Sequence, residues 1–316
     1  MKRTILIGAA FLAACSTPAP EPAKKTEPDG PPEIKAELVA SDPSWGNTEG
    51  PALDSKNNLY FTSRGTYKGI VRWNKTDGAQ QYAPVAKKAG PGGLWIDDAD
   101  NIFLTATDER EVWKLSPSKK VTVIARKFEE NPKEAKGPND IVVARNGIVY
   151  FTDPNGYDGS APNGTAYWIE KNGKTKVFSK EITGTNGIIL SLDEKTLYIS
   201  HNTAKTTSKI TSWPLNEDGG PGAMKEVATV DNCIADGMAV DTEGALWLTC
   251  YSFGTAYRIT PADGKITAKV TTEQKALTNA KFGRGADSHS LYLSSSDMDR
   301  KTGYVYRAQV PVGGPL

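Results

Sequence analysis

The sequence has only two histidines among its 316 residues, and it has no stretch in which lysines or arginines alternate with aromatic residues. Few histidines disfavour a hydrolase built on a histidine dyad, and we find no Ser-His-Asp motif. The formal net charge is +1, so there is no electrostatic basis for binding nucleic acid or an acidic partner. With 38% hydrophobic and 24% charged residues, the composition indicates an ordinary soluble globular protein.

Long hydrophobic runs are also missing, because the apolar stretch at 5–14 is too short to span a bilayer. It follows Lys2 and Arg3, which is the layout of a secretory signal. Its end, LAAC at 12–15, resembles the bacterial lipobox, so we predict a lipoprotein signal peptide over 1–14 with Cys15 lipidated. The alternative is an ordinary signal peptide that happens to contain a cysteine.

The stretch 15–33 holds six prolines and almost no apolar side chains, so we predict a disordered tether there. By resemblance to sorting signals, Ser16 favours the outer membrane. We therefore expect a protein of the bacterial cell envelope, held at the outer membrane only by its N-terminal lipid, with a folded domain over 34–316.

Only three cysteines are present, and lipidation of Cys15 would leave Cys233 and Cys250 in an oxidising compartment. They are predicted either to form a disulfide or to be two small buried core residues. Neither has the His and Asp neighbours of a nucleophile.

Internal repeats predict the fold. Six segments share an apolar residue, an aromatic, an apolar residue and then Thr or Ser, and they start 43, 47, 48, 49 and 45 residues apart. This period is typical of a four-stranded propeller blade. The segments are LYFT at 59–62, IFLT at 102–105, VYFT at 149–152, LYIS at 197–200, LWLT at 246–249 and LYLS at 291–294.

Further short strand patterns flank most of these segments, with turn residues such as DSKNN and ARNG between them. No convincing helix of 12 residues is present. The sequence predicts an all-β, six-bladed β-propeller with four-stranded blades, and we expect a monomer. The segment EIKAELVA at 33–40 is predicted to supply the outer strand of the last blade and close the ring.

One position recurs ten to twelve residues before each aromatic segment, at the start of the predicted first strand. The first strand of each propeller blade lines the central channel, so these six side chains are predicted to converge. They are Glu49, Gly92, Asn139, Asn186, Asp236 and Asn279.

Two carboxylates and several amide oxygens at one point favour a bound divalent cation, because unpaired buried charges are costly. All of these donors are hard oxygens, which suits calcium, magnesium or manganese and argues against structural zinc or copper. The alternative is purely structural, since Asn-Gly and Asp-Gly are common turn dipeptides and polar channel residues can surround ordered water.

Several motifs resemble the regucalcin/gluconolactonase family, which includes luciferin-regenerating enzyme and is related to diisopropyl fluorophosphatase. They are EGP at 49–51, PND at 138–140, YFTDP at 150–154, TNGI at 185–188 and DGMAVD at 236–241. The resemblance covers roughly 45–310 and implies a six-bladed propeller with one catalytic divalent cation, with Ca²⁺ favoured over Mg²⁺, Mn²⁺ or Zn²⁺.

The resemblance also implies roles for single residues. Glu49, Asn186 and Asp236 match metal ligands, Asn139 matches a position that touches the metal or the substrate, and Asp140 matches a residue facing substrate hydroxyls. The sequence departs from the animal members two residues before Asn139, where they have Arg and this chain has Gly137.

These residues predict a metal-dependent hydrolase that opens small lactones. The metal would polarise the lactone carbonyl, and Asp236 would act as general base for water, or as nucleophile as proposed for related phosphoesterases. The alternatives are a phosphotriesterase or diisopropyl fluorophosphatase-like hydrolase, and a noncatalytic binding propeller at the cell surface.

One further side chain could reach the predicted channel mouth from the end of its strand, and three aromatic side chains lie on loops that could wall a pocket. For each of them the alternative is an ordinary role, as a solvated loop residue or in core packing and loop anchoring. They are His201, Trp45, Trp95 and Tyr157.

Overall fold

The computed structural model describes Met1 and residues 30–84, 90–126, 128, 137–154, 156–157 and 164–315. The predicted signal peptide, Cys15 and most of the predicted tether lie outside the described residues. Within the described part of the chain, no helix is long and apolar enough to cross a membrane.

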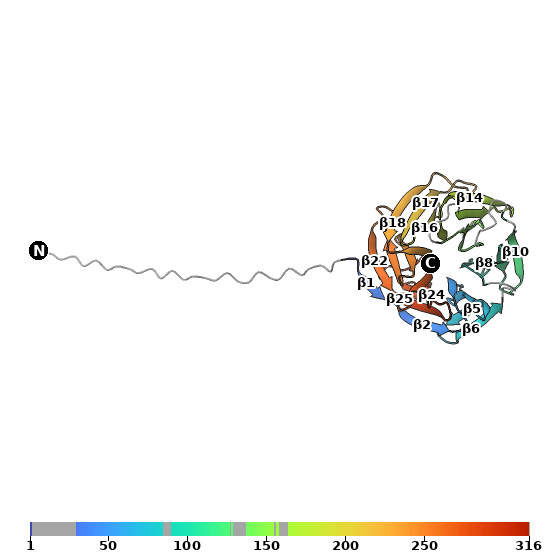
Figure 1. Cartoon of the computed structure of the whole chain (residues 1–316), viewed down its shortest axis with the longest axis horizontal. Coiled ribbons are helices and arrows are strands. Elements are labelled where there is room, and N and C mark those ends of the chain that lie inside the picture. The colour runs from blue at the N-terminus through green and yellow to red at the C-terminus, as the bar shows by residue number, and fades with distance from the viewer. Residues whose placement is uncertain are drawn as a thin grey trace. The chain divides into compact units, whose positions relative to one another are not determined.

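The described chain is all-β, and its only helical element is the short 3₁₀ helix η1 (Gly285–Asp287). Figure 1 shows the sheets following one another in chain order around a central axis, in a propeller arrangement. The all-β propeller prediction is therefore confirmed. In each repeat the aromatic segment forms the second strand, and nearly all of its residues are buried, except that Tyr198 is half-buried, because neighbouring sheets cover both of its faces.

Four of the repeats form separate four-stranded antiparallel sheets, each made of consecutive strands. The first two sheets are β3 (Thr48–Leu53), β4 (Leu59–Arg64), β5 (Lys68–Asn74) and β6 (Gly78–Pro84), then β7 (Leu94–Ile96), β8 (Ile102–Ala106), β9 (Glu111–Leu115) and β10 (Val121–Arg126). The next two are β11 (Ile141–Val143), β12 (Val149–Asp153), β13 (Gly164–Ile169) and β14 (Thr175–Ile182), then β15 (Thr185–Leu190), β16 (Thr196–Ala204), β17 (Thr207–Pro214) and β18 (Lys225–Asp231).

The last two repeats share one nine-stranded sheet, so the strands form five hydrogen-bonded sheets rather than six separate blades. The reason is that β20 reaches past its own repeat and pairs Tyr251 with Ala276 at the start of β23. The strands of this sheet that belong to the two repeats are β19 (Ile234–Val240), β20 (Leu246–Tyr251), β21 (Thr255–Ile259), β22 (Ile266–Thr271), β23 (Ala276–Phe282), β24 (Ser290–Ser296) and β25 (Gly303–Gln309).

The N-terminal segment closes the ring, but it is divided between two places. Strand β2 (Glu37–Asp42) pairs antiparallel with β25, as predicted for an outer strand of the last repeat. Strand β1 (Glu33–Lys35) instead pairs parallel with β22. The predicted tether therefore ends before Glu33, because Pro32 and Ala36 already exchange backbone hydrogen bonds with β22.

The Thr or Ser that recurs at the end of the aromatic segments has a structural role. In five of the six repeats the hydroxyl that ends the aromatic segment donates to a backbone carbonyl at the start of the next repeat. Four of these bonds run from one sheet to the next, and the fifth lies within the shared sheet. These contacts, which we call the hydroxyl latches, are Thr62 to Gly92 at 2.8 Å, Thr105 to Asn139 at 2.7 Å, Thr152 to Asn186 at 2.6 Å, Ser200 to Asp236 at 2.8 Å and Thr249 to Thr278 at 2.8 Å.

The ring is completed by Thr278, whose hydroxyl donates to the carbonyl of Thr48 in the first sheet at 2.8 Å. All of the latch hydroxyls belong to buried residues. A buried carbonyl that loses its donor costs free energy, so the latches hold neighbouring sheets in register.

The cysteine question is resolved in favour of a disulfide between Cys233 and Cys250, and both residues are fully buried. It joins the loop before β19 to β20, with 17 residues of sequence separation. Closing a loop of this length restricts the unfolded chain and stabilises the fold by about 3 kcal/mol.

We expect Thr152→Val to lower the free energy of unfolding by about 2 kcal/mol, because it removes a buried hydroxyl that donates to Asn186. Thr152→Ser keeps the hydroxyl and should lose less. Urea unfolding followed by tryptophan fluorescence measures both values. The matched control is Thr122→Val on an exposed strand position, and equal stabilities of the Thr152→Val and Thr122→Val proteins would contradict the latch.

Candidate functional site

The predicted site residues lie at the starts of the innermost strands. Glu49 is in β3, Asn139 and Asp140 directly precede β11, Asn186 is in β15 and Asp236 is in β19. All except Asp236 are buried, and Asp236 is partly exposed. The backbone of each residue is held by a hydroxyl latch or by hydrogen bonds to a paired strand, so the fold brings these side chains together as predicted. We call this set, with Asn279 of β23, the carboxylate centre.

Asn279 connects two of the carboxylates. Its Nδ2 donates to Glu49 Oε2 at 3.3 Å and to Asp140 Oδ1 at 3.2 Å, so both groups lie within reach of one amide. Sequence reasoning placed Asn279 in the recurring position but not among the site residues. The sequence places Asn279 at the position that recurs before each aromatic segment, but only the structure shows which side chains its amide contacts.

Asp140 is the most firmly held of the acids. Its Oδ1 accepts from the Ile141 backbone at 2.9 Å, and its Oδ2 accepts from the Ile188 backbone in the next sheet at 3.2 Å. Glu49 accepts from the Gly50 backbone at 2.6 Å. Backbone N–H groups therefore fix the directions of these carboxylates.

The two asparagines of the centre contact each other, with Asn139 Nδ2 donating to Asn186 Oδ1. Asn186 Nδ2 in turn donates to the carbonyl of Ala235 at 3.1 Å. The oxygen of Asn186 therefore faces Asn139, and the side chain of Asn186 also forms a hydrogen bond with Asp236.

The three carboxyl groups perturb one another. Burial, and then the charge of Asp140, raise the pKa of Glu49 to about 7. Burial raises the pKa of Asp140 to about 6, although its backbone hydrogen bonds oppose the shift. Burial, Glu49 and Asp140 together raise the pKa of Asp236 well above its ordinary value. The ionised forms therefore lack a compensating positive charge.

This deficit fits a divalent cation. Arg64 and Arg300 act on the centre from a distance, but in the described residues neither forms an ion pair within 4.0 Å of its carboxylates. Among those residues, no group of three His, Cys, Asp or Glu side chains is arranged to hold a metal ion. The donors available here are of another kind, two carboxylates with two amide oxygens, which suits a hard cation.

Two glycines shape the centre. Gly137 has φ of +91°, and a Cβ there would lie 2.1 Å from the carbonyl oxygen of Thr107. The arginine found at this place in animal relatives therefore has no room in this chain. At Gly237 a Cβ would lie 1.9 Å from Cγ of Asn279, so only glycine leaves space for that amide.

The other candidates from the sequence have different roles. Tyr157 and Arg300 lie near the centre. Burial and then the charge of Asp236 raise the pKa of Tyr157, while for Arg300 burial is opposed by Tyr251 and by the charge of Asp236, so that its pKa is raised. His201 is buried, and burial lowers its pKa to about 4, so it is neutral at neutral pH. Trp45 is buried against Phe61 with ring centroids 5.0 Å apart.

Comparison with known proteins assigns the chain to a protein family. Residues 47–297 match the family model described as the SMP-30/Gluconolactonase/LRE-like region. The chain belongs to this family. The resemblance predicted from the motifs is thereby confirmed.

Individual family members are distant in sequence. The chain is 25% identical to a gluconolactonase of Zymomonas mobilis, over 82% of this chain and 78% of that protein. It is 26% identical to regucalcin of Gallus gallus, over 85% of this chain and 89% of that protein. The solved structure of a calcium-binding regucalcin from Agrobacterium tumefaciens has a TM-score of 0.73 at 18% identity, covering 90% of this chain and 97% of that one, and shows the shared fold.

We expect the carboxylate centre to make the metal-free protein less stable as the pH rises. Carboxyls with a raised folded-state pKa hold protons that the unfolded chain releases, so their contribution is full below about pH 4.5 and is lost towards pH 7. For Glu49 alone the change is on the order of 3 kcal/mol.

Urea unfolding in the presence of a chelator at pH 5 and pH 7.5 measures this effect. Glu49→Gln should gain stability relative to wild type at the higher pH, and exposed Glu273→Gln should not. The same pH dependence in wild type and Glu49→Gln would show that the centre carries no such charge.

Proposed function

We propose that the protein hydrolyses small lactones with the help of one divalent cation held at the carboxylate centre. The observation that carries this proposal is the cluster of Glu49, Asp140 and Asp236, two buried carboxyls and one that is partly exposed. Asn279 donates to Glu49 and to Asp140, and the charges of both act on Asp236. Family membership supports lactone hydrolysis, since a relative over most of the chain is a gluconolactonase.

Glu49, Asn139, Asn186 and Asp236 would hold the cation, with Ca²⁺ the first candidate because a structural neighbour is described as calcium-binding. When bound, the cation would polarise the lactone carbonyl and stabilise negative charge on its oxygen. Mg²⁺, Mn²⁺ and Zn²⁺ are the alternatives to be tested.

The residues of the chain supply the remaining chemistry. Asp236 accepts the proton of the attacking water, a role suited to a carboxylate whose pKa lies above its ordinary value because of burial and of the neighbouring carboxylates. Asp140 keeps one lone pair on Oδ2, since Ile141, Asn279 and Ile188 take the others, and with it orients a substrate hydroxyl. Asn139 faces the same space from the start of the third sheet and positions the ring. The product is a hydroxy acid.

We expect purified protein to open D-glucono-1,5-lactone in a pH-stat assay, to lose this activity in excess chelator and to regain it with Ca²⁺, Mn²⁺ or Zn²⁺. Asp236→Asn and Glu49→Gln should each lower kcat/KM by about 10²-fold or more. The control Glu273→Gln should keep full activity. Hydrolysis by the Asp236→Asn, Glu49→Gln double variant would rule out this site.

We also propose that the protein works in the cell envelope, held by a lipid on Cys15. The buried disulfide supports export, because such bonds persist in oxidising compartments. Wild-type protein should enter the detergent phase on Triton X-114 partition of whole cells, and Cys15→Ser should remain in the aqueous phase. Wild-type protein in the aqueous phase would contradict lipidation.

A further inference from the structure

A second cavity, of about 790 Å³, lies at the other end of the channel. It is lined by residues that follow the ends of the inner strands, such as Asp97 after β7, Ala144 after β11 and Ser191 after β15. The carboxylate centre lies at the starts of the same strands, so the two sites occupy opposite ends. We call this cavity the lower pocket.

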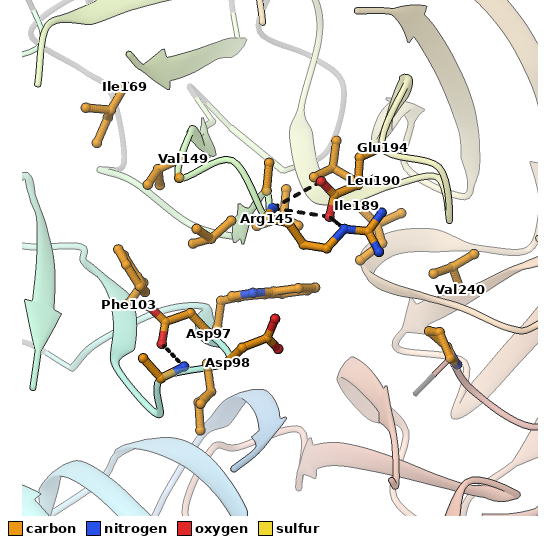
Figure 2. Close-up of a pocket in the computed structure, with 18 of the residues that line it drawn as sticks. Asp97, Asp98, Phe103, Arg145, Val149, Ile169, Ile189, Leu190, Glu194 and Val240 are labelled. Atoms are coloured by element: carbon orange, nitrogen blue, oxygen red, sulfur yellow. Dashed lines mark hydrogen bonds and ion pairs between the residues drawn. The ribbon is translucent and has the colours of Figure 1, made fainter. Parts of the chain in front are cut away.

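The walls of the lower pocket are mainly apolar. Figure 2 shows Phe103, Val149 and Ile169 on one side and Val240 on the other, with the Arg145–Glu194 pair between them. Cavities of this size with apolar walls and a few polar groups are typical of small-molecule sites.

Four cations that line the lower pocket, Lys114, Lys171, Lys281 and Arg284, form no ion pair within 4.0 Å among the described residues, and the last two are close in sequence. Lys281 places its Nζ 3.3 Å from the ring centroid of Trp95, and Arg284 lies three residues further along the chain. In the described residues, no carboxylate oxygen lies within 4.0 Å of either charged group. Burial, and then the charge of Arg284, lower the pKa of Lys281 to about 7, although the charge of Asp140 opposes this shift.

Most acids of the same pocket are already engaged. Asp97 accepts from the backbones of Ala99 and Asn101 at 3.0 and 2.8 Å. Glu194 pairs with Arg145 at 3.2 Å, and Glu170 pairs with Lys176. Only Asp98 is without such a contact among the described residues, and it is exposed. The charge that still needs a partner in the interior of the pocket is therefore positive.

We propose that the lower pocket is a second binding site, which takes a small organic carboxylate with an apolar body. Lys281 and Arg284 bind the carboxylate. The apolar body lies against Trp95, whose indole already faces the pocket, and against Ile189 and Val240. An anion between two close cations lowers their mutual repulsion, and this favours binding.

Isothermal titration of the full chain with 4-phenylbutanoate tests the proposal. One site should be observed, and the neutral analogue 4-phenylbutan-1-ol should bind at least tenfold more weakly, because it cannot form charge-assisted hydrogen bonds. This comparison uses wild-type protein and does not depend on any variant folding. Absence of binding, or equal binding of the alcohol, would overturn the proposal.

Variants locate the site. Lys281→Met and Arg284→Met keep much of the apolar stem and should each weaken 4-phenylbutanoate binding about tenfold or more. Lys265→Met, a cation exposed outside the pocket, should bind as wild type does. Glu49→Gln should also bind normally, because it alters only the carboxylate centre. Loss of binding in Glu49→Gln with retention in Lys281→Met would assign the ligand to the other end of the channel.

Discussion

The hydroxyl latches are the contacts on which the rest of the structure depends. Four of them join the second strand of one repeat to the backbone of a channel residue in the next, as Thr152 does to Asn186 and Ser200 does to Asp236. The bonds that hold neighbouring sheets together are therefore the same bonds that position the carboxylate centre. A loosened boundary between sheets would move a site residue with it, so stability and function rest on one set of buried hydrogen bonds.

The carboxylate centre lowers the stability of the fold. Burying Glu49, Asp140 and Asp236 together opposes their ionisation, and the chain meets this with backbone donors and with the shared amide of Asn279. These neutral donors reduce the cost but do not balance the charge. Perturbed carboxyls gathered in this way are a mark of functional sites, and a hard cation is the partner that their chemistry favours.

The two ends of the channel differ in the charge of their side chains. Carboxylates gather at the starts of the inner strands, whereas Lys281 and Arg284 lie at the ends beside acids that are mostly engaged. Burial raises the pKa of Asp140, and the charge of Lys281 opposes this shift. Asn279 of the carboxylate centre and Lys281 of the lower pocket are only two residues apart on β23. They lie on the same face of this strand. The lower pocket is thus a separate site that shares an electrostatic field with the carboxylate centre.

The sequence by itself determined the all-β class, the repeat period, and the convergence of Glu49, Asn139, Asn186 and Asp236. It did so because a position that recurs once per repeat must recur at one place in a ring. Only the tertiary structure decided which backbones and side chains meet across repeat boundaries. It joined the last two repeats into one sheet, divided the segment 33–40 between two strands, and placed Lys281 over Trp95. These contacts depend on ring closure and on the direction of each side chain, and periodicity along the chain encodes neither.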